Sequence, residues 1–140
     1  MKSLKGYVFS REIGGNLLPQ KIQNIVLRDY SNKKKYNFIM SSVEYSIKNN
    51  FIILNKLIKN LDKYDGILAY SIFQMPNDQN KRVKLYEQII SKKKEFHFAL
   101  EDIVISKSDI QNLNFIEETI SIKKAVKKNT INLKKFKNYT

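Results

Sequence analysis

Residues 7–28 read "YVFSREIGGNLLPQKIQNIVLR", a short apolar segment that leads into a polar loop and then into an amphipathic segment. The apolar segment favours a strand over residues 4–10. Pro19 stands where a helix would begin, and Ile22 and Ile25 follow at helical spacing. The stretch therefore predicts a strand, a loop with two glycines and a helix, which is the unit from which parallel sheets are built.

The alternation of strand and helix continues along the chain. Apolar runs predict further strands at residues 36–42, 65–73 and 95–101, and residues 102–106 are a candidate edge strand. Amphipathic segments between and after them predict helices at residues 49–64, 77–94 and 108–124. Because helices separate the strands, we expect one α/β domain with a mostly parallel sheet of four to five strands and helices on both faces.

The composition excludes several kinds of chemistry. The chain has no cysteine and a single histidine, His97, which excludes disulfides, thiol catalysis and a His-rich metal site within one chain. We expect no metal and no cofactor. The chain has no run of about 18 or more apolar residues, so we expect no membrane span and a cytoplasmic location. His97 lies between two phenylalanines of a predicted strand and is interpreted as a hydrogen-bonded core residue.

Positive charge is concentrated towards the C-terminal end. The net charge is +13, no acidic residue follows Glu118, and without the seven lysines of residues 123–137 the net charge falls to +6. We therefore divide the chain into an α/β domain at residues 1–122 and a basic tail at residues 123–140. Such a tail either stays solvated and disordered or binds nucleic acid or anionic lipid by neutralising phosphates, and both alternatives remain open.

The order of elements resembles the catalytic domain of serine recombinases, the resolvases and invertases. The resemblance covers residues 4–101 and includes "NFIILNKLIKNLDKYDGILAYSIFQMPND" at residues 50–78 and "LYEQIISKKKEFHFALE" at residues 85–101. It implies a resolvase-like sheet with strand order 2-1-3-4, to which the candidate edge strand would be added.

The catalytic residues of that family do not carry over. In an ungapped alignment Phe9 takes the position of the arginine on the first strand and Arg11 that of the nucleophilic serine, and Ser10 reaches that position only with a one-residue gap. The family's Asp, Arg and second Arg after the third strand fall on Phe73, Gln74 and Asn77. Because those arginines neutralise charge on the phosphodiester and a lone serine has little means of activation, we predict no recombinase activity.

A second resemblance is to a small family encoded sporadically in bacterial carbohydrate-biosynthesis clusters. It rests on "GYVFSRE" (6–12), "PQKIQN" (19–24), "YSIFQMP" (70–76) and "FHFALE" (96–101). It implies that the protein binds or modifies a sugar, sugar phosphate or nucleotide-sugar in the synthesis of surface polysaccharide. Whether it is an enzyme stays open. The alternatives are a nucleic-acid-binding derivative of a recombinase domain and a non-catalytic partner subunit of a biosynthetic enzyme.

In a sheet of this kind the site is expected outside the carboxyl ends of the strands, where strand order reverses. Ser10 and Glu101 are the catalytic candidates, as nucleophile and as general acid or base. The remaining candidates are polar residues near those strand ends that could bind an anionic sugar: Arg11, Gln20, Gln23, Asn24, Arg28, Glu44, Tyr45, Ser71 and Gln74.

Each residue type in this set has a ligand-binding and a structural interpretation. Arginine is rare here, and its planar fork suits a phosphate or carboxylate, but it also suits structural ion pairs. Serine hydroxyls and the three amides of the first helix could meet sugar hydroxyls, cap helices or face solvent. Phe73 could pack in the core or stack on a sugar ring.

The last predicted helix, at residues 108–124, favours association of the chain with further copies of itself. Its segment "IQNLNFIEETISIKKAV" offers an apolar set broader than one small sheet needs to cover it: Ile110, Leu113, Ile116, Ile120 and Ile122. Part of that set is expected to face a second subunit, so we expect a homodimer or a higher symmetric oligomer.

Overall fold

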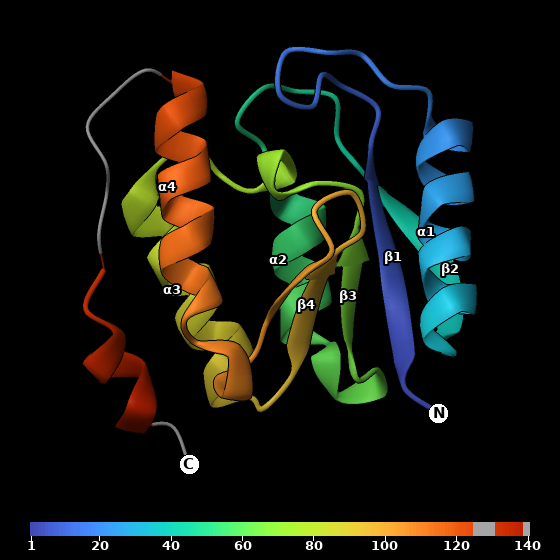
Figure 1. Ribbon diagram of the computed structural model, residues 1–140. Helices are drawn as coiled ribbons and strands as arrows, with labels where there is room; N and C mark the ends of the chain where they lie inside the picture. The colour runs from blue at the N-terminus through green and yellow to red at the C-terminus, as the bar shows by residue number, and fades with distance from the viewer. Residues whose placement is uncertain (125–130, 139–140) are drawn as a thin grey trace.

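Strand β1 (Ser3–Phe9) lies inside a five-stranded sheet with the order β2-β1-β3-β4-β5 (Figure 1). The computed structural model describes residues 1–124 and 131–138. The other strands are β2 (Asn37–Glu44), β3 (Gly66–Ala69), β4 (Glu95–Phe98) and β5 (Ile103–Ile105). The strand order 2-1-3-4 that the resemblance implied is therefore present, and the candidate edge strand extends it beyond β4.

The sheet is mixed, which corrects the expectation of a mostly parallel one. The pairs β1–β2, β1–β3 and β3–β4 are parallel, whereas β5 runs antiparallel to β4. Only residues 99–102 connect these last two strands, and a parallel connection needs a crossover of about a dozen residues or more. Asp102 lies at φ 53 in this connection, so the chain reverses tightly and returns along the edge.

Among the described residues, four α-helices cover the sheet on its two faces. Helix α1 (Gln20–Lys34) packs alone on one face, while α2 (Ile52–Lys59), α3 (Gln79–Ser91) and α4 (Asn112–Lys124) share the other (Figure 1). Short 3-10 helices join or follow these elements at Leu61–Lys63 (η1), Ile72–Gln74 (η2), Lys107–Asp109 (η3) and Leu133–Asn138 (η4). The fold is thus the three-layer α/β arrangement that the sequence predicts.

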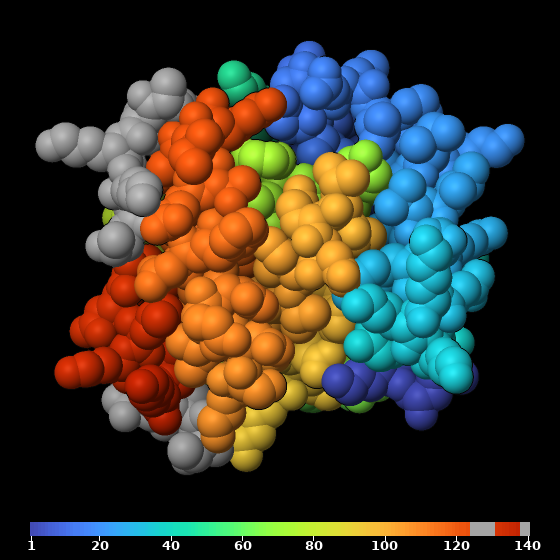
Figure 2. Space-filling model, in the orientation of Figure 1, coloured from blue at the N-terminus to red at the C-terminus, as the bar shows by residue number. Residues whose placement is uncertain are grey.

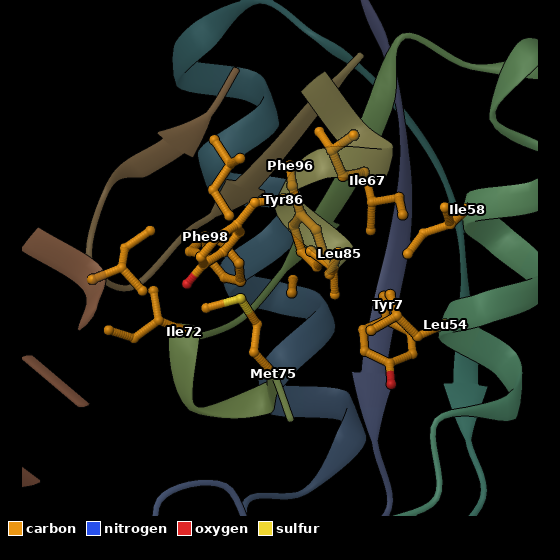
Figure 3. Close-up of a cluster of buried hydrophobic side chains, with 14 of the residues drawn as sticks. Tyr7, Leu54, Ile58, Ile67, Ile72, Met75, Leu85, Tyr86, Phe96 and Phe98 are labelled. Carbon is orange, nitrogen blue, oxygen red and sulfur yellow. The ribbon is translucent and has the colours of Figure 1, made fainter. Parts of the chain in front are cut away.

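The core follows the alternation of side chains along the buried strands. On β1, Leu4 and Val8 point to the cluster under α1, whereas Tyr7 and Phe9 point to the larger cluster under the other helices. Figure 3 shows that larger cluster, in which side chains of β1, β3 and β4 meet those of α2 and α3. Gly6 is required where β1 and β2 approach closely, because a Cβ there would lie 2.1 Å from the Ser41 hydroxyl.

The apolar set of the last helix is largely used inside the domain. Leu113 and Ile116 are fully buried and Ile120 is 5% exposed, and all three belong to the larger core cluster. Ile122 is exposed. The core therefore accounts for most of the set and leaves Ile122 exposed, and oligomerisation stays a prediction.

Part of the predicted basic tail packs against the domain. The predicted boundary at residue 123 falls inside α4, and in η4 the Phe136 ring is buried in the larger core cluster while Lys135 pairs with Glu87. Residues 125–130 and 139–140 of the tail lie outside the described residues. Across the described ranges, no helix is long and apolar enough to cross a membrane.

Candidate functional site

The carboxyl ends of β1 and β3 open onto a cavity of about 600 Å³. Its walls come from the loops after β1 and β2, from the segment of residues 72–77 and from the last turns of α4. In Figure 1 these loops gather at one end of the sheet beside the C-terminal end of α4, and Figure 2 shows the segment near residue 72 between α4 and the loop after β1. The location agrees with the rule that α/β sites lie beyond the carboxyl ends of strands.

Arg11 forms one wall of the cavity and holds the loop after β2 in place. Its Nη1 donates to three backbone carbonyl oxygens, those of Tyr45 at 2.7 Å, Ile47 at 3.0 Å and Asn50 at 2.9 Å. The guanidinium carbon lies 4.2 Å from the ring centroid of Phe9 and 4.9 Å from that of Phe51. Arg11 is therefore fixed from several sides, and its Nε and Nη2 make no hydrogen bond to any described residue.

Two lysines and one carboxylate accompany Arg11 around the cavity. Lys48 lines it from the loop after β2, and Lys123 reaches it from α4, where its Nζ lies 5.7 Å from the centroid of the Phe73 ring. Within the described residues, Glu12 is the one acidic side chain among those that line the cavity. The positive charges outnumber the negative one, so the cavity attracts anions.

A tight turn with two glycines closes the cavity over Phe73. Ile13 and Asn16 exchange backbone hydrogen bonds of 2.8 and 3.1 Å, and Gly14 and Gly15 between them have positive φ angles of 57° and 90°. A Cβ at Gly14 would lie 3.4 Å from the Phe73 ring. Glycine therefore supplies the positive φ angles that this turn needs.

The two catalytic candidates do not line the cavity. Ser10 is exposed, and its hydroxyl makes one long hydrogen bond of 3.4 Å to the carbonyl oxygen of Glu44. Glu101 accepts from the Ser71 hydroxyl at 2.7 Å and from the Ile72 backbone N–H at 3.0 Å. Ser10 and Glu101 therefore bond to different segments, and Glu101 satisfies the start of η2.

Ser71 and Gln74 form a reciprocal capping arrangement at η2. The Ser71 hydroxyl accepts from the Phe73 N–H at 3.2 Å, and the Gln74 side chain accepts from the Ser71 N–H at 2.9 Å. The Gln74 amide also donates to the carbonyl oxygen of Tyr7 at 3.3 Å. Both side chains are buried and neither is a lining residue of the cavity, so they position the segment that carries Phe73.

Glu44 is a buried carboxylate that accepts hydrogen bonds from neighbouring side-chain and backbone groups. It accepts from the Tyr7 hydroxyl at 2.7 Å and from the backbone N–H groups of Ile53 at 3.0 Å and Leu54 at 3.1 Å, in the first turn of α2. Burial, together with the hydrogen bond to Glu44, raises the pKa of Tyr7 far above its usual value. Glu44 therefore stabilises the start of α2 and the end of β1, and neighbouring Tyr45 contributes its carbonyl to Arg11.

The candidates on α1 lie outside the cavity lining. Gln20 is exposed, and Arg28 is exposed with its guanidinium 5.8 Å from the Phe38 ring centroid. Gln23 is fully buried and bonds the Phe9 N–H at 2.9 Å and the Phe9 carbonyl at 2.8 Å. Asn24 accepts from the Ser41 hydroxyl at 2.6 Å. These contacts attach α1 to β1 and β2 and leave Arg11 as the one predicted ligand residue at the described cavity wall.

His97 is the hydrogen-bonded core residue that the sequence predicts. Its Nδ1 lies 2.7 Å from the Tyr30 hydroxyl and its Nε2 lies 2.7 Å from the Glu95 carboxylate, which also pairs with Lys2. The hydrogen bond with His97 outweighs the effect of burial and, with Lys2, lowers the pKa of Glu95 to about 2. This network lies on the α1 face of the sheet and belongs to the core.

Sequence reasoning missed several cavity residues. Lys123 was assigned to the tail, and Lys48 and Phe51 were not considered. Phe73 was weighed as a stacking residue and does line the cavity. The available signal was the cluster of aromatic residues that follow or end predicted strands, since such residues lie where the site of an α/β sheet is expected.

Comparison with known proteins supports the fold. The chain matches no protein-family model and no curated protein. Among solved structures it is similar to the N-terminal catalytic domain of TP901-1 integrase, with a TM-score of 0.60 and 16% sequence identity over 86% of this chain and 92% of that chain. At this identity the likeness shows the fold alone, and it confirms the resolvase-like α/β fold. The carbohydrate-cluster family receives no support from these comparisons.

Proposed function

We propose that the protein binds a small anionic sugar derivative, a sugar phosphate or a nucleotide-sugar, in the cavity at the ends of β1 and β3. The observation that carries this proposal is the combination of aromatic rings and cationic side chains around one cavity of about 600 Å³. Phe51 and Phe73 offer flat apolar surface to a ring, and Lys48 and Lys123 offer charge to a phosphate. Cavities of this volume accommodate small metabolites.

The positions of the cavity residues argue against recombination. Phe73 and Asn77, which the resemblance aligns with the recombinase Asp and second Arg, line the cavity and supply neither a carboxylate nor a guanidinium. The Nη1 of Arg11 donates its hydrogen bonds to three backbone carbonyl oxygens of the protein itself. A phosphodiester bound near Ser10 would therefore lack the arginines that stabilise its transition state.

A role in carbohydrate biosynthesis is supported by the sequence resemblance to the sporadic carbohydrate-cluster family. Whether the protein also modifies its ligand depends on an acid–base group at the cavity. Within the described ranges Glu12 is the one lining carboxylate that could supply it. Turnover that is lost in Glu12→Gln while binding persists would make the protein an enzyme, and binding without turnover would make it a binding accessory or partner subunit.

The alternative of nucleic-acid binding depends on the basic tail. Lys123 lines the cavity and Lys135 pairs with Glu87, so these two charges of the tail are engaged with the domain. Binding to DNA through the remaining lysines would weaken steeply as salt is raised. The affinity for a sugar phosphate held among aromatic walls would fall less steeply with salt.

Calorimetric titration with glucose 1-phosphate and with glucose tests the proposal. We expect glucose 1-phosphate to bind. Lys123→Ala should weaken the binding free energy of this compound by about 1.5–3 kcal/mol, the usual value of a hydrogen bond to a charged group. Phe73→Ala should weaken binding of the same compound. Lys21→Ala, which removes an exposed lysine from α1, is the matched control and should change nothing. Equal losses in Lys21→Ala and Lys123→Ala would contradict a localised site.

A further inference from the structure

A second hollow adjoins the cavity on the side of α2 and α3. It has a volume of about 320 Å³ and lies between these two helices. Asn49, Phe51 and Pro76 line both hollows, so the two share a wall at the loop after β2 and at the segment before α3. A ligand that fills the larger cavity could therefore continue past this wall into the smaller one.

The chemistry of the smaller cavity differs from that of the larger. Lys81 and Lys84 line it one turn apart on α3, and Asn55 on α2 and Gln88 on α3, which carry side-chain amides, line it as well. No acidic residue is among its described lining residues, and neither lysine makes an ion pair within the described ranges. Ammonium groups suit phosphate, and amides suit the hydroxyl groups of a sugar.

The two cavities together offer three kinds of side chain to a ligand. The larger one presents the Phe73 ring together with Arg11 and Lys123, the shared wall presents Phe51, and the smaller one presents lysines and amides. A monosaccharide phosphate needs only one of these compartments. A nucleoside diphosphate sugar combines a planar base, two linked phosphates and a hydroxyl-rich ring, and the two cavities together offer aromatic, cationic and amide side chains for these three parts.

We infer that the two cavities form one site for a nucleoside diphosphate sugar. This rests on the proposed function, that the larger cavity binds an anionic sugar derivative. The base stacks on the aromatic rings of the larger cavity, the diphosphate lies near the shared wall between the cations of both compartments, and the sugar meets Asn55 and Gln88. The smaller cavity therefore distinguishes a nucleotide-sugar from a simple sugar phosphate.

The test compares two ligands on two matched double variants at about 0.15 M salt, where long-range charge effects are screened. The ligands are glucose 1-phosphate and the tightest binder from UDP-glucose, ADP-glucose and GDP-mannose. Lys81→Ala/Lys84→Ala removes the lysines of the smaller cavity. Lys56→Ala/Lys59→Ala removes two exposed lysines with the same spacing from α2, and these line neither cavity.

We expect the nucleotide-sugar to bind at least about tenfold more tightly than glucose 1-phosphate, since each hydrogen bond to a charged group is worth about tenfold or more. Lys81→Ala/Lys84→Ala should abolish that advantage and leave the affinity for glucose 1-phosphate within about twofold of wild type. The α2 control should change the affinity for neither ligand by more than about twofold. If glucose 1-phosphate binds and depends on Lys123 but the nucleotide-sugars bind no more tightly, the two-cavity inference is wrong and the proposed function stands. If no probe binds, both are wrong.

Discussion

Removal of the Glu117 carboxylate should destabilise the domain more than the loss of an ordinary surface charge. Glu117 on α4 and Arg82 on α3 are 0% and 1% exposed. The Glu117 carboxylate accepts from Arg82 Nε at 2.8 Å, from Arg82 Nη2 at 2.7 Å and from the Tyr86 hydroxyl at 2.6 Å. Burial opposes ionisation of Glu117, but these hydrogen bonds outweigh it and hold the pKa of Glu117 below its usual value.

The magnitude follows from what Glu117→Ala leaves behind. The Arg82 guanidinium would remain buried with a charge that no carboxylate balances, and breaking a buried pair in this way costs about 3–5 kcal/mol. That is a large part of the stability of a small domain, which is about 5–15 kcal/mol. Replacement of both partners, as Arg82→Met/Glu117→Leu, should recover part of the loss, because it removes the unbalanced buried charge but leaves the Tyr86 hydroxyl without the Glu117 carboxylate.

Urea denaturation followed by circular dichroism at neutral pH measures these losses. The matched control is the exposed ion pair of Asp29 and Lys33, whose nitrogen and oxygen lie 3.0 Å apart with side chains 60% and 74% exposed. Asp29→Ala should cost about 0.5 kcal/mol or less. If Glu117→Ala costs no more than Asp29→Ala, the assignment of Arg82 and Glu117 as a strongly coupled buried pair is refuted.

The same pair also connects two walls of the larger cavity. Arg82 Nη1 donates to the carbonyl oxygens of Pro76 at 3.0 Å and Asn77 at 2.7 Å, and both residues line the cavity. On α4, Ile120 and Lys123 lie one and two turns after Glu117 and line it as well. Arg82 therefore acts as a positioning residue for the site.

Three further predictions address other parts of the domain. Because the pKa of Glu95 is lowered to about 2, its contribution to stability should be complete above about pH 4.5 and lost as pH falls towards 2. The difference in unfolding free energy between wild type and Glu95→Gln should therefore shrink over that interval. A constant difference would contradict the lowered pKa. Arg11→Ala should free the loop after β2 from its three carbonyl contacts and speed limited proteolysis between Tyr45 and Phe51, whereas Arg28→Ala should not. Wild type incubated with supercoiled DNA should form no covalent adduct; an adduct that disappears in Ser10→Ala would overturn the view that recombinase chemistry is absent.

The parallel arrangement of β1 to β4 could be predicted from the sequence. The antiparallel direction of β5 could also have been predicted. Apolar runs separated by amphipathic segments indicate parallel strands with helical crossovers, and β1 to β4 follow that rule. The antiparallel β5 departs from it because four residues cannot form a crossover. The length of that connection is visible in the sequence, so this error was avoidable.

The composition of the site could not be predicted in the same way. Polar residues at strand ends either meet a ligand or satisfy the backbone of the loops, and sequence alone does not separate the two roles. Here Glu44, Ser71 and Glu101 satisfy loop and helix backbones. Arg11 has both roles, since it donates to three loop carbonyl oxygens and also lines the cavity. Lys123 lines the cavity only because α4 packs beside the loops, a tertiary contact that local pattern does not encode.

The central claim is that an anionic sugar derivative occupies the cavity at the ends of β1 and β3. A backbone-amide NMR titration of the full chain with glucose 1-phosphate tests it most directly. We predict saturable shifts concentrated at cavity residues of three separate segments, represented by Gly14, Asn49 and Phe73, with little change at η4. Shifts confined to the basic residues of η4, or no saturable shifts at the cavity, would contradict the claim.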